Sequence, residues 1–106
     1  MTGRLDGFVP AAKASELPPG HIKCVAVNRE RVLLANVDGT VYALQDACGH
    51  RGASLSGGKL YGYAIECPLH YALFDARTGK LLSGPASADV ATYEVRVEAD
   101  TVYVKR

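Results

Sequence analysis

The chain has 106 residues, of which 48% are apolar and 22% are charged, and its formal net charge is +1. This length predicts one domain with a small core, and the composition is ordinary for a globular protein. A near-neutral chain without basic runs excludes a polyanion-binding module, so we expect no nucleic-acid partner. Residues 1–20 contain no apolar stretch long enough for a signal peptide or a membrane span. We therefore expect a cytoplasmic protein whose thiols stay reduced.

Short β-rich runs separated by tight turns follow in the first half of the chain. Residues 22–27 and 31–37 are two such runs, and Asn28-Arg29-Glu30 connects them. Asp38-Gly39 then leads to a third run at residues 40–44. Because Asp-Gly between two β-rich runs is a strong hairpin signal, the sequence predicts antiparallel pairing here.

A second hairpin is predicted near the end of the chain. Residues 92–98 and 101–105 alternate apolar and polar side chains, and Ala99-Asp100 separates them. No segment has a sustained helical period, and residues 13–17 allow only a short turn before Pro18-Pro19-Gly20. The sequence therefore predicts an all-β fold, a small antiparallel sandwich or partly open barrel.

Two cysteine–histidine pairs lie between these hairpins. Cys48-x-His50 is followed, after sixteen residues, by Cys67-x-x-His70. Thiolate and imidazole ligands together suit zinc or a 2Fe–2S cluster with mixed ligation. Each residue alone is more simply a buried thiol or a surface imidazole, but two matched pairs flanked by glycine and proline indicate one metal site.

The remaining cysteine and histidine have no such neighbours. Cys24 lies inside the run at residues 22–27, and we interpret it as a core thiol. His21 follows Pro18-Pro19-Gly20, and we interpret it as a surface residue.

The segments CGHRGASL and CPLHYALFDARTGKLLSGPA resemble the two cluster-binding loops of Rieske iron–sulfur proteins. The flanking hairpins fit the basal domain of that family, so the resemblance covers nearly the whole chain. Within the family, the chain is similar to the small Rieske-type ferredoxins of bacterial ring-hydroxylating dioxygenase systems, such as those acting on biphenyl or carbazole.

This resemblance implies a ligand set and a division of the chain. Cys48 and Cys67 would hold one iron of a single 2Fe–2S cluster as thiolates, and His50 and His70 would hold the other iron through Nδ1. The whole chain would be one Rieske domain, with a basal part at residues 1–44 and 83–106 and an inserted cluster-binding part at residues 45–82.

The resemblance also implies a function. The protein would be a one-electron carrier and not an enzyme, shuttling electrons from an NAD(P)H-dependent ferredoxin reductase to a terminal Rieske oxygenase. We expect a monomer without membrane contact, because a carrier must expose one cluster tip to two partners in turn. Pro68, Leu69, Pro85 and Ala53 are candidates for an apolar ring around the tip. Arg51 and Lys59 are candidates for steering charges, although simple solvent exposure explains them equally well.

The predicted reduction potential follows from four positions. High-potential members of the family carry a cysteine in each loop where this chain has Ala53 and Leu69, and Ser and Tyr hydroxyls where it has Ala72 and Phe74. Fewer hydrogen bonds to sulfur predict a potential at the low end of the Rieske range. Tyr63 and Tyr71 remain candidate donors.

Three alternatives compete with the electron carrier. An oxygenase in its own right would need a two-histidine, one-carboxylate iron site, but only His21 remains once the cluster is ligated. A structural zinc domain is permitted by the ligand types but is less favoured by the loop residues. A Rieske subunit of an exported oxidase would be expected to carry an export signal.

Overall fold

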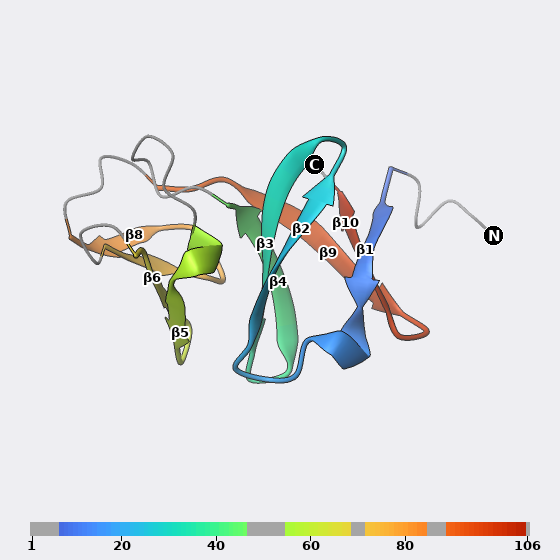
Figure 1. Cartoon of the computed structure of the whole chain (residues 1–106), viewed down its shortest axis with the longest axis horizontal. Helices are drawn as coiled ribbons and strands as arrows, with labels where there is room; N and C mark the ends of the chain where they lie inside the picture. Colours follow the sequence, from blue (N-terminus) through green and yellow to red (C-terminus); the bar gives the residue numbers. More distant parts are fainter. Residues whose placement is uncertain (1–6, 47–54, 69–71, 85–88, 106) are drawn as a thin grey trace.

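The computed structural model describes residues 7–46, 55–68, 72–84 and 89–105 (Figure 1). These residues form two antiparallel sheets, one of six strands in the order β1-β10-β9-β4-β3-β2 and one of four strands in the order β5-β6-β7-β8. The strands of the six-stranded sheet are β1 (Val9–Lys13), β2 (Ile22–Val27), β3 (Glu30–Val37), β4 (Thr40–Gln45), β9 (Thr92–Glu98) and β10 (Thr101–Lys105). Those of the four-stranded sheet are β5 (Lys59–Tyr61), β6 (Ala64–Glu66), β7 (Leu73–Asp75) and β8 (Leu81–Ser83).

Three two-residue turns build the six-stranded sheet. In each turn both central residues have positive φ, namely Asn28 (52°) and Arg29 (70°), Asp38 (55°) and Gly39 (97°), and Ala99 (50°) and Asp100 (67°). This is the backbone of the type I′ turn, whose twist matches that of the flanking strands. The predicted hairpins are therefore confirmed, and the first connection is one residue shorter than expected because β3 begins at Glu30.

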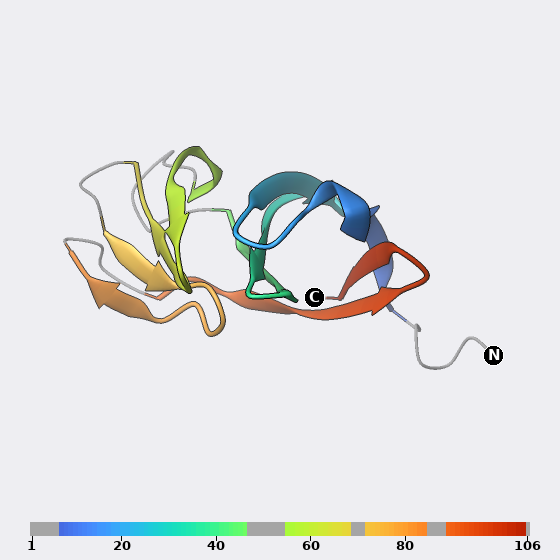
Figure 2. The ribbon, with the colours of Figure 1, turned by 90° about the horizontal axis from the view of Figure 1, so that it is seen from below.

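The six-stranded sheet curls until its two edges approach each other (Figure 2). β1 pairs with β10 and also contacts β2, so the sheet is nearly a closed barrel. Pro10 is tolerated in β1 because an edge strand has unpaired backbone positions. The sequence did not predict β1, but it did predict the short turn after it, which is a 3₁₀ turn at Ala14–Glu16.

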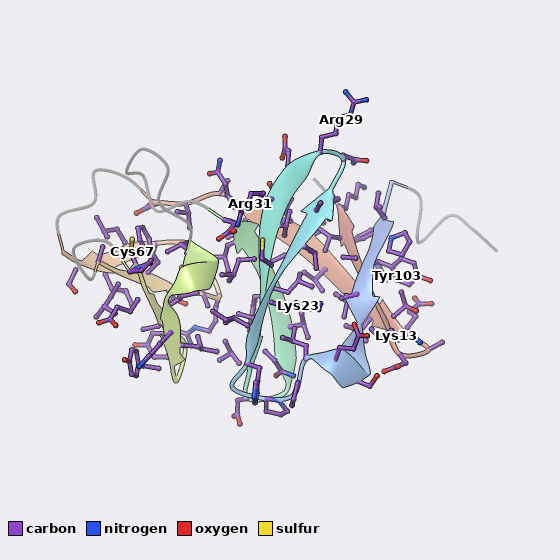
Figure 3. The ribbon with its side chains drawn as sticks, viewed as in Figure 1. Lys13, Lys23, Arg29, Arg31, Cys67 and Tyr103 are labelled. Atoms are coloured by element: carbon purple, nitrogen blue, oxygen red, sulfur yellow. The ribbon has the colours of Figure 1, made fainter. Side chains whose placement is uncertain are left out.

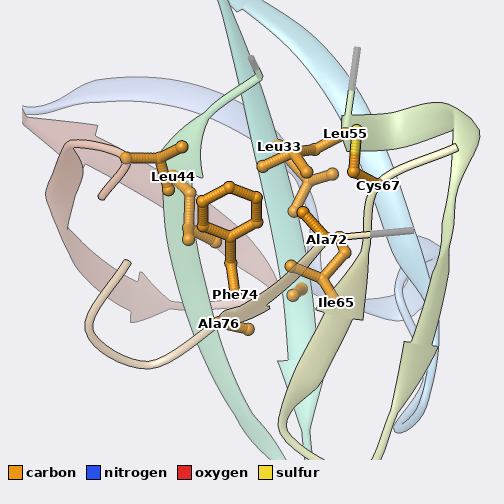
Figure 4. Close-up of a cluster of buried hydrophobic side chains, with 10 residues drawn as sticks. Leu33, Leu44, Leu55, Ile65, Cys67, Ala72, Phe74 and Ala76 are labelled. Atoms are coloured by element: carbon orange, nitrogen blue, oxygen red, sulfur yellow. The ribbon is translucent and has the colours of Figure 1, made fainter. Parts of the chain in front are cut away.

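β3 separates two hydrophobic cores because its side chains alternate between its faces. Val32 and Leu34 face the barrel interior, whereas Leu33 and Ala35 face the four-stranded sheet. The barrel core consists of Leu17, Val27, Val32, Leu34, Ala43, Val102 and Val104. The second core, between the sheets, consists of Leu33, Ala35, Leu44, Leu55, Ile65, Cys67, Ala72, Phe74, Ala76 and Val90 (Figure 4).

The four-stranded sheet lies beside the barrel and extends the molecule in one direction (Figure 1). Its strands have three residues each, and the sequence did not predict them. An all-β fold that combines a barrel with an inserted part is confirmed, while the predicted boundaries of the basal and cluster-binding parts stay predictions. In the described ranges of the chain, no helix is long and apolar enough to cross a membrane.

Candidate metal centre

Of the four predicted ligands, only Cys67 lies among the described residues. Cys48, His50 and His70 fall within residues 47–54 and 69–71, outside the part that the structure describes. The described ranges contain no group of three or more side chains that could hold a metal ion. The assignment of the four ligands therefore stays a prediction, and the structure bears on it through the surroundings of Cys67.

Cys67 follows directly after β6 and points into the second core. Its residue is 0% exposed, and it packs in one cluster with Leu55, Ile65 and Ala72 (Figures 3 and 4). Its backbone N–H donates to the carbonyl oxygen of Ala72 at 2.7 Å. This bond brings the backbones of Cys67 and Ala72 together at the base of the loop between them.

Two further segments meet at this loop base. Gly84 follows β8 with φ +102°, and a Cβ built on it would lie 2.6 Å from the Cα atom of Ala72. Only glycine allows both this left-handed backbone and this close approach. A Cβ on Gly57 would lie 3.5 Å from Cγ of Pro68. The chain therefore brings three backbone segments together around one buried cysteine.

These surroundings fit a cluster bound through a thiolate. A buried sulfur on a tightly closed loop has a fixed position, which a metal ligand needs. Main-chain turns close to that sulfur can also supply N–H donors to thiolate or inorganic sulfide. Cys67 is therefore a chemically suitable ligand, and its role as one stays a prediction.

The strand that leads to the first predicted loop ends in a charged network. Asp46 follows β4, and its side chain is fully buried, with 0% exposed. Its Oδ2 accepts a hydrogen bond from Cys24 Sγ at 3.1 Å and from Arg31 Nε at 3.3 Å, and Arg31 Nη2 lies 3.3 Å away. The pKa of the Arg31 guanidinium is raised above its ordinary value, first by a side-chain hydrogen bond with Cys24 and also by the charge of Asp46. Arg31 lies beside the end of β4 (Figure 3).

This network corrects the interpretation of Cys24. It was expected to be a core thiol, but it is half-buried and donates to a carboxylate. The sequence did not reveal the contact because Cys24 and Asp46 are 22 positions apart and share no local motif. His21 is exposed, as predicted, and its Nδ1 lies 3.3 Å from the carbonyl oxygen of Pro19.

Tyr63 lies away from Cys67. It occupies the turn between β5 and β6, at the opposite end of β6 from Cys67, and the guanidinium carbon of Arg77 stands 3.9 Å from its ring centroid. This position is wrong for a hydrogen bond to the sulfur of Cys67. Tyr63 and Arg77 instead line an open hollow of about 670 Å³ between the two sheets, together with Tyr42 and Asp38.

Comparison with known protein families and proteins shows which family the chain belongs to. Residues 7–94 match the family described as Rieske [2Fe-2S] domain. The ferredoxin component of the naphthalene 1,2-dioxygenase/salicylate 5-hydroxylase systems of a Ralstonia species is 40% identical over 98 residues, which cover 92% of this chain and 94% of that protein. The biphenyl dioxygenase ferredoxin subunit of Pseudomonas sp. (strain KKS102) is 41% identical over 98 residues, covering 92% and 90%.

Solved structures give the same result. The ferredoxin of carbazole 1,9a-dioxygenase from Nocardioides aromaticivorans IC177 superposes with a TM-score of 0.87 at 32% identity, covering 92% of this chain and 96% of that one. A chain from the complex of reduced oxygenase and oxidized ferredoxin in carbazole 1,9a-dioxygenase superposes with a TM-score of 0.86 at 36% identity, covering 93% of both. The predicted resemblance is confirmed. The relatives are ferredoxin components, which also confirms the predicted class of electron-transfer component.

Proposed function

The chain belongs to the Rieske [2Fe-2S] family, and from this premise we propose that it carries single electrons from an NAD(P)H-dependent ferredoxin reductase to the terminal oxygenase of an aromatic-ring dioxygenase system. One observation carries the proposal. Relatives that match over more than nine-tenths of the chain are ferredoxin components of such systems. A similar structure was solved as a complex of ferredoxin with oxygenase, which supports the second half of the transfer.

The cofactor is one Rieske-type 2Fe–2S cluster. We assign Cys48, His50, Cys67 and His70 as its ligands. When bound, the cluster takes up and releases one electron at a time, at a potential raised by replacing two anionic thiolates with neutral imidazoles. The chain itself supplies a buried sulfur at Cys67, a loop closed by the Ala72 carbonyl, and apolar packing that keeps water away from one side of the sulfur.

The presence of a separate small sheet that contains β5 to β8 supports the predicted cluster-binding part at residues 45–82. Cys67 follows β6 of the four-stranded sheet, and this sheet packs against the six-stranded barrel. The predicted boundary at residue 82 falls within β8 (Leu81–Ser83). We assign the carrier to the cytoplasm, where NAD(P)H is available and thiols stay reduced, and we expect it to act as a monomer.

Docking would use the loop end of the four-stranded sheet. Pro68 is exposed at the loop base, and exposed Lys59 begins β5 in the same sheet. Transient redox interfaces are small, so a modest apolar patch with a few charges at its rim suffices for partner binding. Lys59 would act mainly on the association rate, because rim charges steer encounters more than they add affinity.

The ligand set is tested by replacing each proposed ligand with alanine. We expect His50→Ala, His70→Ala and Cys67→Ala to lose the rhombic EPR signal of the reduced cluster and the equal iron and sulfide content. His21→Ala is the matched control, because His21 is exposed and outside the proposed site. An intact signal in His50→Ala would refute the assignment, and bound zinc in anaerobically prepared wild-type protein would refute the cluster itself.

The electron-carrier function is tested with purified partners. We expect NADH and a ferredoxin reductase of an aromatic dioxygenase system to reduce the protein, and the reduced protein to be reoxidised by the cognate terminal oxygenase. Single-turnover absorbance measurements would follow both steps. A protein with an intact cluster that exchanges no electrons with either partner would contradict the proposal.

A further inference from the structure

Three side chains meet where the polypeptide leaves β4 for the first predicted ligand loop. Cys24 on β2 and Arg31 on β3 both contact one carboxylate oxygen, Oδ2 of Asp46, which follows β4. We refer to these three residues as the polar clamp. Asp46 is two positions before Cys48, so the clamp holds a residue just before the first proposed ligand.

The backbone is held at the same place. The N–H of Asp46 donates to the carbonyl oxygen of Arg31 at 3.1 Å, and the N–H of Gln45 donates to the carbonyl oxygen of Ala91 at 2.8 Å. The strand end is therefore bonded on both sides before the chain departs. The clamp adds a side-chain restraint at Asp46 to these main-chain bonds.

Burial makes the clamp stronger than an exposed ion pair. The Asp46 side chain is 0% exposed, whereas that of Arg31 is 66% exposed and borders an open hollow of about 530 Å³. A buried carboxylate is costly unless it is paired and hydrogen-bonded. Moving the Asp46 carboxylate away from Cys24 and Arg31 would leave a buried charge without these donors, so its position is restrained.

The clamp is also continuous with the core around the second ligand loop. Cys24 stands opposite Leu33 in the β2–β3 pairing. Leu33 packs in the same core as Leu55 and Cys67. One polar contact and one apolar layer thus connect the start of the first loop with the buried cysteine of the second.

We propose that the polar clamp positions the first ligand loop and thereby controls how firmly the cluster is retained. Asp46 is a positioning residue here, because it acts through the backbone that precedes Cys48. The inference rests on the proposed ligand set. Partners that orient metal ligands from behind typically change metal affinity by about 10- to 100-fold when they are removed.

The test measures cluster loss to an iron chelator at a temperature well below the melting temperature, followed by visible absorbance and EPR. We expect Asp46→Ala to lose the cluster about 10- to 100-fold faster than wild type. Cys24→Ala should lose it faster than wild type, and Cys24→Ser, which keeps a donor, should restore the slow rate. This rescue would not occur if Cys24 acted only by filling space.

The chain offers a matched control in the Asp75–Arg77 pair. Arg77 Nη2 lies 2.9 Å from Asp75 Oδ2, and the pair joins the last residue of β7 to the turn that follows it. We expect Arg77→Ala to lower the melting temperature while the rate of cluster loss stays at the wild-type value. Equally faster cluster loss in Asp46→Ala and Arg77→Ala would overturn the proposal, because it would show that the clamp acts only through overall protein stability.

Failure of the inference and failure of the ligand set are distinguishable. If His50→Ala abolishes the cluster and the Cys24 and Asp46 variants retain it as wild type does, the clamp is refuted and the ligands stand. If His50→Ala keeps the cluster, the ligand set fails, and the clamp, which depends on it, is also overturned. If Asp46→Ala does not fold, the comparison of Cys24→Ala with Cys24→Ser decides.

Discussion

Asp75, the last residue of β7, accepts several hydrogen bonds from Arg77 in the turn that follows. Its Oδ1 accepts the backbone N–H of Arg77 at 2.8 Å and Arg77 Nε at 3.0 Å, and its Oδ2 accepts Arg77 Nη2 at 2.9 Å. The side-chain hydrogen bond from Arg77 lowers the pKa of Asp75 below its ordinary value of 3.8, and burial opposes this only in part. Local order in this turn therefore depends on an ionised carboxylate.

A pH-dependent contribution to stability follows from that shift. Because the pKa of Asp75 is lower in the folded than in the unfolded protein, its stabilisation is complete above the unfolded value and disappears as the pH falls through the folded value. We expect the difference in unfolding free energy between wild type and Asp75→Asn to be constant from pH 7 to 5 and to shrink below about pH 4. Denaturant titrations at each pH measure it. A difference that persists unchanged at the lowest accessible pH would contradict this role.

The reduction potential is also set at the residue scale. Ala72 and Phe74 occupy the positions where high-potential relatives are expected to have hydroxyls, and both are fully buried and apolar. We predict a potential at the low end of the Rieske range of roughly −150 to +300 mV, measured by protein-film voltammetry. A value above about +100 mV would contradict the prediction.

Adding a hydroxyl tests the cause. A net hydrogen bond of about 1 kcal/mol corresponds to roughly 40 mV for a one-electron couple. We therefore expect Ala72→Ser to raise the potential by up to roughly this amount, whereas Ala76→Ser, buried beyond β7, should leave it unchanged. Equal shifts in both variants would show that general polarity, and not a bond near the cluster, is responsible.

Among the structural elements, the hairpin between β9 and β10 contains a residue that is poorly suited to its turn. Ala99 has φ 50°, a left-handed conformation that disfavours a residue with a Cβ atom by roughly 1 kcal/mol or more. Asn and Gly are the residues that type I′ turns prefer at this position. We expect Ala99→Asn and Ala99→Gly to raise the free energy of unfolding by about 1 kcal/mol, measured by denaturant titration.

The control for this turn is Ala26→Gly, at an exposed position within β2. There the same loss of a methyl group should lower the free energy of unfolding by about 0.5–1 kcal/mol, because glycine weakens a strand interior. Destabilisation by both Ala99 substitutions would show that the turn gains nothing from relieving the positive φ.

The elements that the sequence predicted are those with local signals. Asp38-Gly39 and the alternation at residues 92–98 and 101–105 identify their hairpins without tertiary information. The four strands β5 to β8 have three residues each, which is too short for alternation to be recognised. β1 was missed because it contains Pro10, which is compatible with a strand only at the edge of a sheet.

The same distinction applies to the candidate site. The two cysteine–histidine pairs are visible because their members are two or three positions apart. The contacts of Asp46 with Cys24 and Arg31 span 22 and 15 positions, so they exist only once β2, β3 and β4 are paired. Gly84 resembles an ordinary turn glycine in the sequence, and only the fold shows that it lies against Ala72.

For the whole molecule, β3 is the wall that the two cores share. Leu33 and Leu34 are adjacent, both are 0% exposed, and they face opposite sides of the sheet. The cluster-binding sheet therefore packs on the outer face of a barrel whose interior is filled separately. This arrangement predicts that damage to one core affects the cluster differently from damage to the other.

Substituting the two leucines separates these effects. Leu33→Ala and Leu34→Ala should each lower the free energy of unfolding by about 2–5 kcal/mol, because each leaves a cavity in a packed core. Only Leu33 shares a core with Cys67, so only Leu33→Ala should also accelerate cluster loss to a chelator under conditions where both variants remain folded. Leu34→Ala serves as the control of equal size at the neighbouring position. Equal rates of cluster loss in the two variants would contradict the prediction, because a cavity in the barrel core would then affect cluster retention as much as a cavity in the core around Cys67.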